Sequence, residues 1–436
     1  MIAVFLLGTA AVLLLHGYLY ARNWIRALSV RVHFSQPHIC AHEVCELTET
    51  IENRKRMALP VLEIGFRLPK GLRFEDAENT QESDYLYKRD LFAVRGMERI
   101  VRRYHVTAQH RGFYTVSQLT CHAPSRLFGF SYVMDRNAQE GEIGLFVYAA
   151  RVDCSLLLRT IEVILGEQEC ARNLYEDPFV FAAIRPYTIR DPMKAINWKA
   201  TAKTGELMVN TYASTSAVRV RIFLDVSADP LLPFADSLRE LGIAMAASLI
   251  RALVKAQRDA SLTVNCSVED ARMQAEARAA RSAGGASETV TYPRAGDLDG
   301  ARSAHDPQVH ADAVRFASCR SAGRMTAVEE FLTTDFDSCT LLPFEQLLRQ
   351  EAQGDAGQGA AAAAGASPEE VFVFLTPADR PSLRLQIHSL LGVHRSGILA
   401  IPSRTADGRM QERERNLLIL PVYETTVTIH GRSESL

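Results

Sequence analysis

The sequence predicts a multidomain α+β protein with an N-terminal transmembrane helix, then a β-sandwich domain, then an α/β domain. Three observations predict this fold class. They are an apolar run over residues 1–20, alternating apolar and polar residues within 28–175, and strand–helix alternation within 216–436. The 436 residues are enough for two or three domains with a sizeable core.

The composition excludes several classes of protein. Lys and Arg total 49 against 51 Asp and Glu, so the net charge is -2 and a nucleic-acid binder with a strongly basic body is excluded. The 8 Cys are too dilute for a disulfide scaffold. The sequence contains no C-x-x-C pair, which argues against a structural zinc site. We therefore expect no nucleic acid among the partners.

The first 22 residues are predicted to be a transmembrane anchor. Twenty helical residues span about 30 Å, which matches the hydrocarbon core of a bilayer. No Lys or Arg precedes the run, and three arginines follow it: Arg22, Arg26 and Arg31. This charge bias predicts a single pass through a bacterial inner membrane, with the folded domains in the cytoplasm. A buried core helix is the alternative interpretation.

Residues 28–175 are predicted to form a β-sandwich. The stretches 30–34 and 61–68 alternate with a period of two, which is typical of strands with one buried face. Short strands of this kind, separated by turn residues such as Pro69 and Gly71, favour two packed antiparallel sheets.

Residues 216–436 are predicted to form a layered α/β domain. Strands and helices alternate over 218–225, 234–257, 371–375, 381–391 and 397–402. Two stretches interrupt this pattern, 269–322 and 353–368. Because both are rich in small and polar residues, we expect flexible insertions there.

The segment 180–215 contains a distinctive motif that runs from Arg185 to Val209. It resembles the signature of the domain-of-unknown-function 58 family, in which Arg-x-Tyr is followed by Gly-Asp, a basic residue, Ile, Trp, Gly and Leu. The matching residues are Arg185, Tyr187, Asp191, Lys194, Ile196, Trp198, Lys199, Ala202, Gly205 and Leu207. Three positions depart from the family: Arg190 replaces Gly, Asn197 replaces His and Lys203 replaces Arg.

The resemblance implies a fold, a partner and a role. It implies that the α/β domain is similar to the Rossmann-like von Willebrand factor type A fold. It also implies association with a MoxR-type AAA+ ATPase and with other membrane or envelope proteins. Proteins of this family are thought to assist the assembly or maintenance of such complexes.

The charges of the motif allow two interpretations. Asp191 can pair with Arg185 or Lys194, and Trp198 can cover that pair from water, which would make the motif a structural brace at the domain junction. Alternatively, Arg185, Lys194 and Lys199, with other nearby cations, form a docking surface for an acidic partner.

A degenerate metal motif follows the first strand of the α/β domain. Type A folds that bind an ion use Asp-x-Ser-x-Ser there, and this chain has Asp225, Ser227 and Asp229, with Asp379 as a remote acid. These oxygen ligands suit Mg²⁺, although no cofactor is required by the predicted role. Alternatively, Asp225 caps the next helix or turn.

No enzyme motif is present in the sequence. It contains no G-x-x-x-x-G-K-[ST], no G-x-S-x-G and no H-E-x-x-H, so we predict no catalytic residues. We expect a membrane-anchored, non-enzymatic scaffold or adaptor. Two alternatives stay open: a hydrolase or peptidase-like enzyme of envelope metabolism, and a metal-dependent adhesion module.

Overall fold

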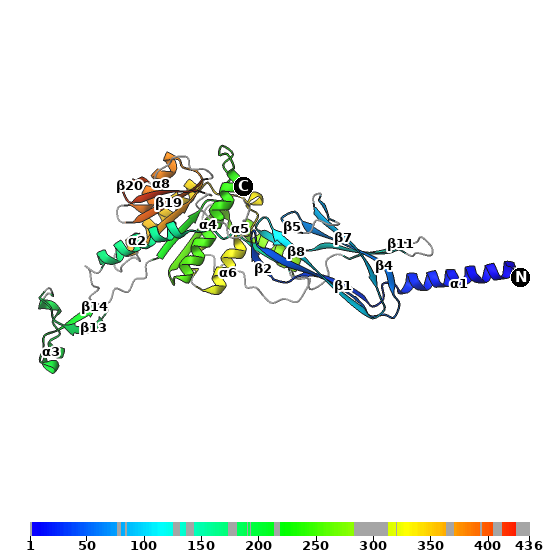
Figure 1. Cartoon of the computed structure of the whole chain (residues 1–436). Coiled ribbons are helices and arrows are strands. Elements are labelled where there is room, and N and C mark those ends of the chain that lie inside the picture. The colour runs from blue at the N-terminus through cyan, green and yellow to red at the C-terminus, as the bar shows by residue number, and fades with distance from the viewer. Residues whose placement is uncertain are drawn as a thin grey trace.

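A computed structural model describes most of the chain. The described residues are 2–75, 80–82, 85–124, 131–136, 144–172, 181–189, 191, 193–212, 219–282, 313–319, 321–362, 370–392, 395–403 and 412–423. They form a mixed, sheet-rich α+β protein in which a β-sandwich lies between an N-terminal helix and an α/β domain (Figure 1).

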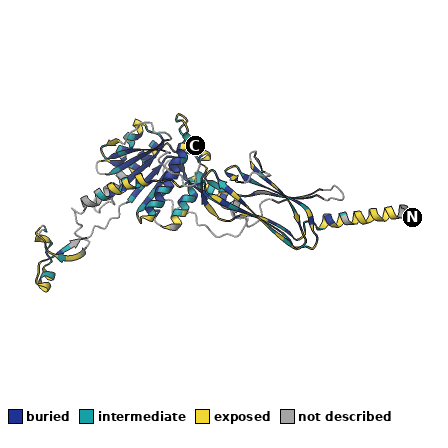
Figure 2. Cartoon of the chain, viewed as in Figure 1, coloured by how far each residue is buried: buried dark blue, intermediate teal, exposed yellow. Residues whose placement is uncertain are grey.

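Helix α1 (Ile2–Asn23) extends from one end of the β-sandwich. Its described side chains, those of residues 5–15, 17–20 and 22–23, are almost all exposed (Figure 2). Tyr20 at its end and Trp24 just beyond it are buried in the core of the sandwich instead. Across the described part of the chain, no helix combines the length and apolarity needed to cross a bilayer.

The β-sandwich consists of two antiparallel sheets. One has the strand order β1-β3-β8-β5 and the other the order β11-β10-β4-β7-β6. The first sheet comprises β1 (Leu28–Phe34), β3 (Val44–Asn53), β5 (Leu72–Phe74) and β8 (Glu98–Ala108). The second comprises β4 (Leu59–Pro69), β6 (Thr80–Glu82), β7 (Tyr85–Val94), β10 (Ser117–Pro124) and β11 (Ser131–Arg136). Alternate residues of β3 and β4, such as Leu47 and Ile64, point inward and form the core, as the period-two pattern predicts.

A small third sheet lies between the sandwich and the α/β domain. It has the order β2-β12-β9, with β2 at His38–Cys40, β9 at Gly112–Tyr114 and β12 at Leu145–Tyr148. The chain leaves this sheet through Ala149 and Val152, which pack into the core of the α/β domain.

The α/β domain is built on a seven-stranded sheet with the order β17-β16-β15-β18-β19-β21-β20. The inner pairings are parallel, and the two edge strands pair antiparallel. The strands are β15 (Arg219–Leu224), β16 (Asp259–Ser267), β17 (Ala313–Phe316), β18 (Glu370–Leu375), β19 (Ser396–Ser403), β20 (Glu412–Glu414) and β21 (Leu417–Tyr423). The helices are α2 (Ser155–Arg172), α4 (Ala235–Lys255), α5 (Val268–Ser282), α6 (Ala322–Phe331), η2 (Phe336–Ser338), α7 (Phe344–Ala362) and α8 (Pro381–Leu391).

Helices cover both faces of this sheet. Ile222 of β15 lies in one core together with residues of α2, α4 and α6, whereas Phe223 lies in the opposite core with residues of α7 and α8. Because neighbouring residues of a strand point to opposite faces, a strand covered on both sides is apolar at successive positions, as residues 222–224 of β15 and 371–375 of β18 are.

Three segments differ from the boundaries predicted by the sequence. Helix α2 lies within the range assigned to the sandwich, but Leu157, Ile161 and Leu165 pack in the α/β core. Helix α5, from its second residue on, and strand β17 lie within 269–322, and α7 continues to Ala362 within 353–368. Residues 283–312 and 363–368 lie outside the described residues. Composition alone missed α5 because tertiary contacts hold it: Arg278 donates to the Glu330 carbonyl at 3.1 Å.

Candidate functional site

The motif segment forms a small separate unit, which we call the signature subdomain (residues 181–212). It consists of β13 (Phe181–Pro186), η1 (Met193–Ala195), α3 (Trp198–Thr204) and β14 (Met208–Tyr212), with β13 and β14 paired antiparallel. Figure 1 shows it standing apart from the seven-stranded sheet.

An ion pair between Arg185 and Asp191 closes the loop after β13. The guanidinium donates to both carboxylate oxygens of Asp191, at 2.7 and 2.6 Å. The backbone N–H and the hydroxyl of Thr188 also donate to Asp191, at 2.8 and 2.7 Å. These donors hold the pKa of Asp191 well below its usual range. The Asp191 carboxylate is therefore ionised at neutral pH, and its ion pair with Arg185 keeps the loop closed.

Helix α3 is short, and both of its ends are capped. The Asn197 side chain accepts from the Ala200 N–H at 2.9 Å and donates to the Asn210 side chain at 2.7 Å, which ties the helix to β14. Gly205 ends the helix with φ +78°, a left-handed conformation that favours glycine, and its N–H donates to the Thr201 carbonyl. The Tyr187 N–H donates to the Leu207 carbonyl at 2.8 Å, so the loop ends stay paired.

Trp198 does not cover the ion pair, and this corrects the brace interpretation of that residue. Its side chain is 66% exposed at the start of α3. The subdomain is too small to enclose an indole: Ile196 and Val209 are its buried apolar residues among those described. The Arg185–Asp191 pair and the Thr188 donors hold the loop without the indole.

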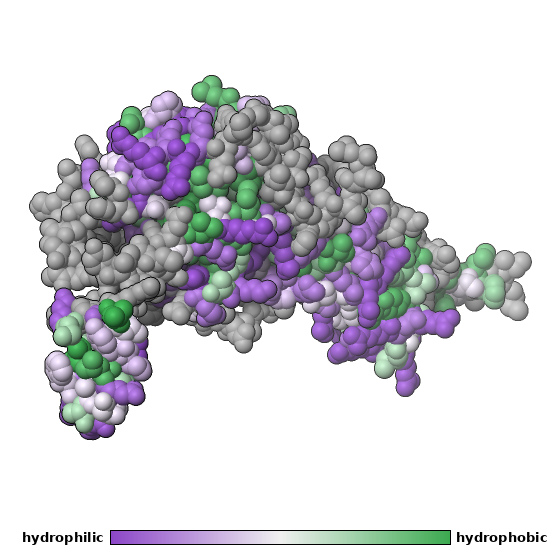
Figure 3. Space-filling model, turned by 60° about the vertical axis from the view of Figure 1, so that its left-hand side comes forward, coloured by the Kyte–Doolittle hydropathy of each residue, from purple (hydrophilic) through white to green (hydrophobic). Residues whose placement is uncertain are grey.

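Exposed apolar side chains gather on this unit, together with lysines. We call the former the apolar patch; its members are Ile184, Ile189, Met193, Trp198 and Leu207. Lys194, Lys199 and Lys203 are exposed on the same short segment. Figure 3 shows hydrophobic and hydrophilic residues side by side on its surface.

The predicted metal motif lies at the carboxyl end of β15, as expected. The Asp225 carboxylate is buried and accepts hydrogen bonds from the Ser227 N–H (3.0 Å), the Ser227 hydroxyl (2.5 Å), the Asn265 amide (2.9 Å) and the Thr376 hydroxyl (2.8 Å). Burial raises the pKa of Asp225, and these four donors oppose that shift.

The other two acids face arginines. Asp229 forms an ion pair with Arg380, and Asp379 forms a two-bond pair with Arg384 at 2.8 Å for each bond. Asp379 is therefore not brought to Asp225. A cavity of about 190 Å³ at this strand edge is lined by Asp225, Ser227 and Asp229, with Arg380 among its walls.

This arrangement does not fit a divalent ion. The Asp225 oxygens accept from N–H and O–H donors, and the guanidinium of Arg380 takes the position beside Asp229 that a cation would need. Within the described residues, no group of three or more His, Cys, Asp or Glu side chains is placed to hold an ion. We derive no step through Mg²⁺.

Sequence reasoning missed Asn265, Thr376 and Arg380. Thr376 directly follows the apolar strand 371–375, and carboxyl ends of neighbouring parallel strands meet at one sheet edge. That adjacency could have identified Thr376. The position of Arg380 depends on the turn after β18, which the sequence pattern leaves open.

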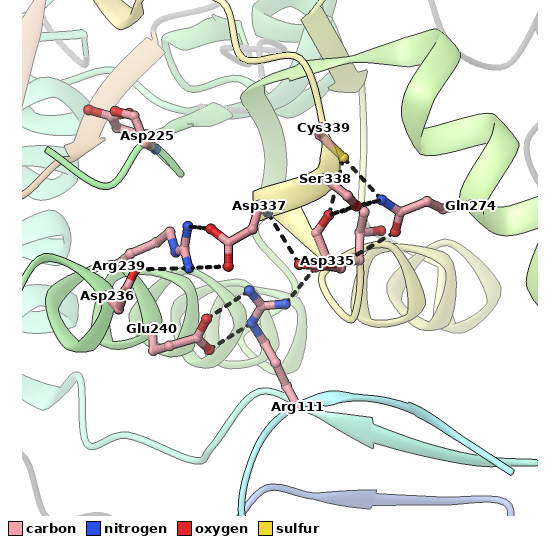
Figure 4. A network of polar contacts seen from close by, with 12 residues as sticks. Arg111, Asp225, Asp236, Arg239, Glu240, Gln274, Asp335, Asp337, Ser338 and Cys339 are labelled. Atoms are coloured by element: carbon pink, nitrogen blue, oxygen red, sulfur yellow. Dashed lines mark hydrogen bonds and ion pairs between the residues drawn. The ribbon is translucent and has the colours of Figure 1, made fainter. Parts of the chain in front are cut away.

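A second polar site lies between the two large domains (Figure 4). Arg111, in the turn before β9, forms an ion pair with Glu240 of α4: its Nη2 donates to Oε1 at 2.8 Å, and its Nε lies 2.8 Å from Oε2. It also donates to the carbonyls of Leu332 (3.0 Å) and Thr334 (2.7 Å), beyond the end of α6. Nearby, Arg239 forms an ion pair with Asp337. A cavity of about 900 Å³ lies along this junction.

Comparison with known proteins adds little to this geometry. No family model matches the chain, and no curated protein matches it. Among solved structures, a CARDB domain from Pyrococcus furiosus is 12% identical over 26% of this chain and 94% of its own, with a TM-score of 0.16. A cohesin module of a Clostridium perfringens glycoside hydrolase is 8% identical over 28% and 96%, with a TM-score of 0.20.

Likenesses this weak carry no argument about activity. The fold and the sites define a sheet-rich, multidomain α+β protein. Membership of the domain-of-unknown-function 58 family stays a prediction from the motif.

Proposed function

We propose that this protein is a membrane-anchored, non-enzymatic scaffold that presents the signature subdomain to a MoxR-type AAA+ ATPase. It would serve the assembly or maintenance of envelope or other protein complexes, and its α/β domain would be a von Willebrand factor type A-like module. The observation that carries the proposal is the apolar patch around Trp198, set among lysines on a unit that is braced separately from the large domains.

A small unit that exposes a tryptophan together with a methionine and two isoleucines has the composition of a binding surface. Tryptophan is enriched among residues that dominate binding energy, and contiguous apolar patches on soluble domains mark interaction sites. Lys194, Lys199 and Lys203 add positive charge around the patch, which favours an acidic partner surface and faster association.

Helix α1 supports the membrane part of the proposal. The described apolar side chains of residues 5–15 are exposed, including Phe5, Leu7 and Leu14, and no described element covers them. A bilayer would bury them at about 25 cal/mol per Å² of apolar surface. Arg22 lies in the last turn of the helix and Arg26 just beyond it, which favours a cytoplasmic location for the domains at an inner membrane.

The described side chains favour a scaffold over a hydrolase. His122 contacts Glu63 at 2.9 Å and His388 contacts Glu414 at 3.4 Å, and neither imidazole has a Ser or Cys partner among the described hydrogen bonds. Burial raises the pKa of the Cys154 thiol to about 12, which disfavours the nucleophilic thiolate.

The test compares two double variants of the full-length chain in lipid nanodiscs. Met193→Ser with Trp198→Ser removes the centre of the apolar patch, whereas Leu231→Ser with Leu385→Ser removes equally exposed apolar side chains of the α/β domain. Binding of a purified MoxR-type ATPase encoded beside this chain is measured by interferometry. We expect the first pair to weaken binding about tenfold or more, and the control pair to leave it unchanged.

Equal binding by both double variants and the wild type would remove the patch from the interface. A wild type that binds no such ATPase, but hydrolyses a peptide or an envelope polymer unaided, would replace the scaffold with the hydrolase alternative.

A further inference from the structure

Three chain segments converge where α1 meets the β-sandwich: 24–28, 53–58 and 94–99. The Arg54 N–H donates to the Ala27 carbonyl and the Met97 N–H to the Lys55 carbonyl, both at 2.9 Å. The buried Asn53 amide donates to the carbonyls of Met57 and Arg95, at 3.0 and 2.8 Å. The two turns and the end of the helix are thus one connected surface.

The joint between this surface and the helix is tightly packed. Trp24 is only 4% exposed, and its carbonyl accepts a hydrogen bond from the Lys55 ammonium at 2.6 Å. Gly96 lies so close to the other turn that a Cβ atom there would be 2.1 Å from the Arg56 carbonyl oxygen. The position of the turns relative to α1 is therefore fixed by packing and hydrogen bonds.

This surface carries a strong excess of positive charge, and we call it the basic collar. Its exposed cations are Arg22, Arg26, Arg54, Arg56, Arg95 and Arg99, with Lys55 half-buried among them. Two acids accompany them: Glu52, paired with Arg54 at 2.9 Å, and Glu98, which accepts from the Arg95 N–H. The excess contrasts with the net charge of -2 of the whole chain.

We propose that the basic collar binds the phosphate groups of anionic lipids at the membrane surface. This inference rests on the proposed embedding of α1, because the collar then lies at headgroup level around the base of the helix. Guanidinium groups match phosphate oxygens with paired hydrogen bonds, and each cation near an anionic leaflet contributes attraction.

One apolar residue fits the same surface. Met97, at the tip of the second turn, is 70% exposed among the arginines. An apolar side chain beside cations is the composition of surfaces that insert shallowly between headgroups. Lipid contact explains this exposure, whereas a purely electrostatic partner would not need it.

Nucleic acid presents the same phosphate chemistry, but the position of the collar disfavours it. The cations lie on turns that are hydrogen-bonded to the segment directly after an exposed apolar helix. Binding of DNA is therefore an outcome of the test rather than a second proposal.

The test measures lipid preference with the full-length chain. Flotation with phosphatidylcholine vesicles first establishes whether α1 embeds. In vesicles of equimolar phosphatidylcholine and phosphatidylglycerol, electron spin resonance then compares spin-labelled forms of the two lipids at the protein surface. We expect about a fivefold preference for phosphatidylglycerol at low salt, lost at high salt, because a few cations act at the surface.

A matched pair of variants locates the effect. Combining Arg26→Gln, Arg56→Gln, Arg95→Gln and Arg99→Gln should abolish the preference, because all four arginines are exposed collar residues. The control combines Arg159→Gln, Arg324→Gln, Arg349→Gln and Arg413→Gln, which removes the same number of exposed arginines from the α/β domain and should leave the preference intact. All substituted side chains lie on the surface, so melting temperatures should stay close to that of the wild type.

The outcomes separate this inference from the proposed function. A wild type that does not float with neutral vesicles contradicts the anchor itself. A wild type that embeds but shows no lipid preference, or keeps it in the collar variant, overturns the inference alone. Duplex DNA bound by the embedded chain through the same four arginines, without a lipid preference, would assign the collar to nucleic acid and also overturn it.

Discussion

Replacing Arg111 with Ala should weaken the junction between the β-sandwich and the α/β domain. The Arg111 side chain is 7% exposed, and its guanidinium also lies 5.0 Å from the ring centre of Phe336. Truncation removes the ion pair with Glu240 and both hydrogen bonds to carbonyls beyond α6 at once.

The magnitude follows from these contacts. A hydrogen bond from a charged donor is worth about 1.5 to 3 kcal/mol, and Arg111 donates two to buried or half-buried carbonyls. Glu240 is 43% exposed, so solvent screening limits its ion pair to about 1 kcal/mol or less. Water can reach the carbonyls through the adjoining cavity and recover part of the loss. We expect a net destabilisation of about 3 kcal/mol.

The measurement is urea denaturation of the full-length protein in detergent, followed by circular dichroism. Arg111→Ala should lower the free energy of unfolding of the α/β domain and separate its transition from that of the sandwich. Arg111→Lys should recover part of the loss, because one ammonium cannot reach all three partners. Arg73→Ala, at an exposed position in β5 of the β-sandwich, is the control. A loss below about 0.5 kcal/mol for Arg111→Ala would refute the argument that this residue joins the domains.

Three further predictions concern single residues. Asp225→Ala should destabilise the α/β domain by about 3 kcal/mol because it leaves buried donors unpaired. Neither Mg²⁺ nor a chelator should change the melting temperature of the wild type. A melting temperature that rises with Mg²⁺ in the wild type but not in the variant would restore the metal site. Burial raises the pKa of Glu49 from 4.5 to about 7, so the folded state holds a proton on this carboxyl that the unfolded state has released. The free energy of unfolding should therefore fall by about 3 kcal/mol as pH rises from 4.5 to 7. Glu49→Gln should remove this pH dependence, and a variant that keeps it would show that another group causes it. Trp198→Ala should cost less than about 0.5 kcal/mol in thermal unfolding, and a loss above 2 kcal/mol would show that the indole is buried in solution.

Much of the local structure was predictable from sequence patterns. The alternation within 30–34 and 61–68 corresponds to β1 and β4, and the apolar run 371–375 corresponds to the buried central strand β18. These patterns work because each strand's periodicity records which of its faces is buried.

The candidate sites were only partly predictable. The sequence offered Arg185 and Lys194 as partners for Asp191, and the structure pairs Asp191 with Arg185. The prediction that Trp198 covers that pair was wrong, because so short a segment has no core in which to enclose it. Asp379 has the expected position after β18 but pairs with Arg384, which lies five residues further on in α8.

The sequence by itself determined the strands over 30–34, 61–68 and 371–375, the helices over 234–257 and 381–391, and the residues that carry the motif, because these properties depend on near neighbours along the chain. Only the tertiary structure decided that α2 belongs to the α/β core, that Arg380 stands beside Asp229, and that 24–28, 53–58 and 94–99 meet in one basic surface. Each of these depends on contacts between residues far apart in the chain. Local periodicity does not encode such contacts, since they follow from how whole sheets and helices pack.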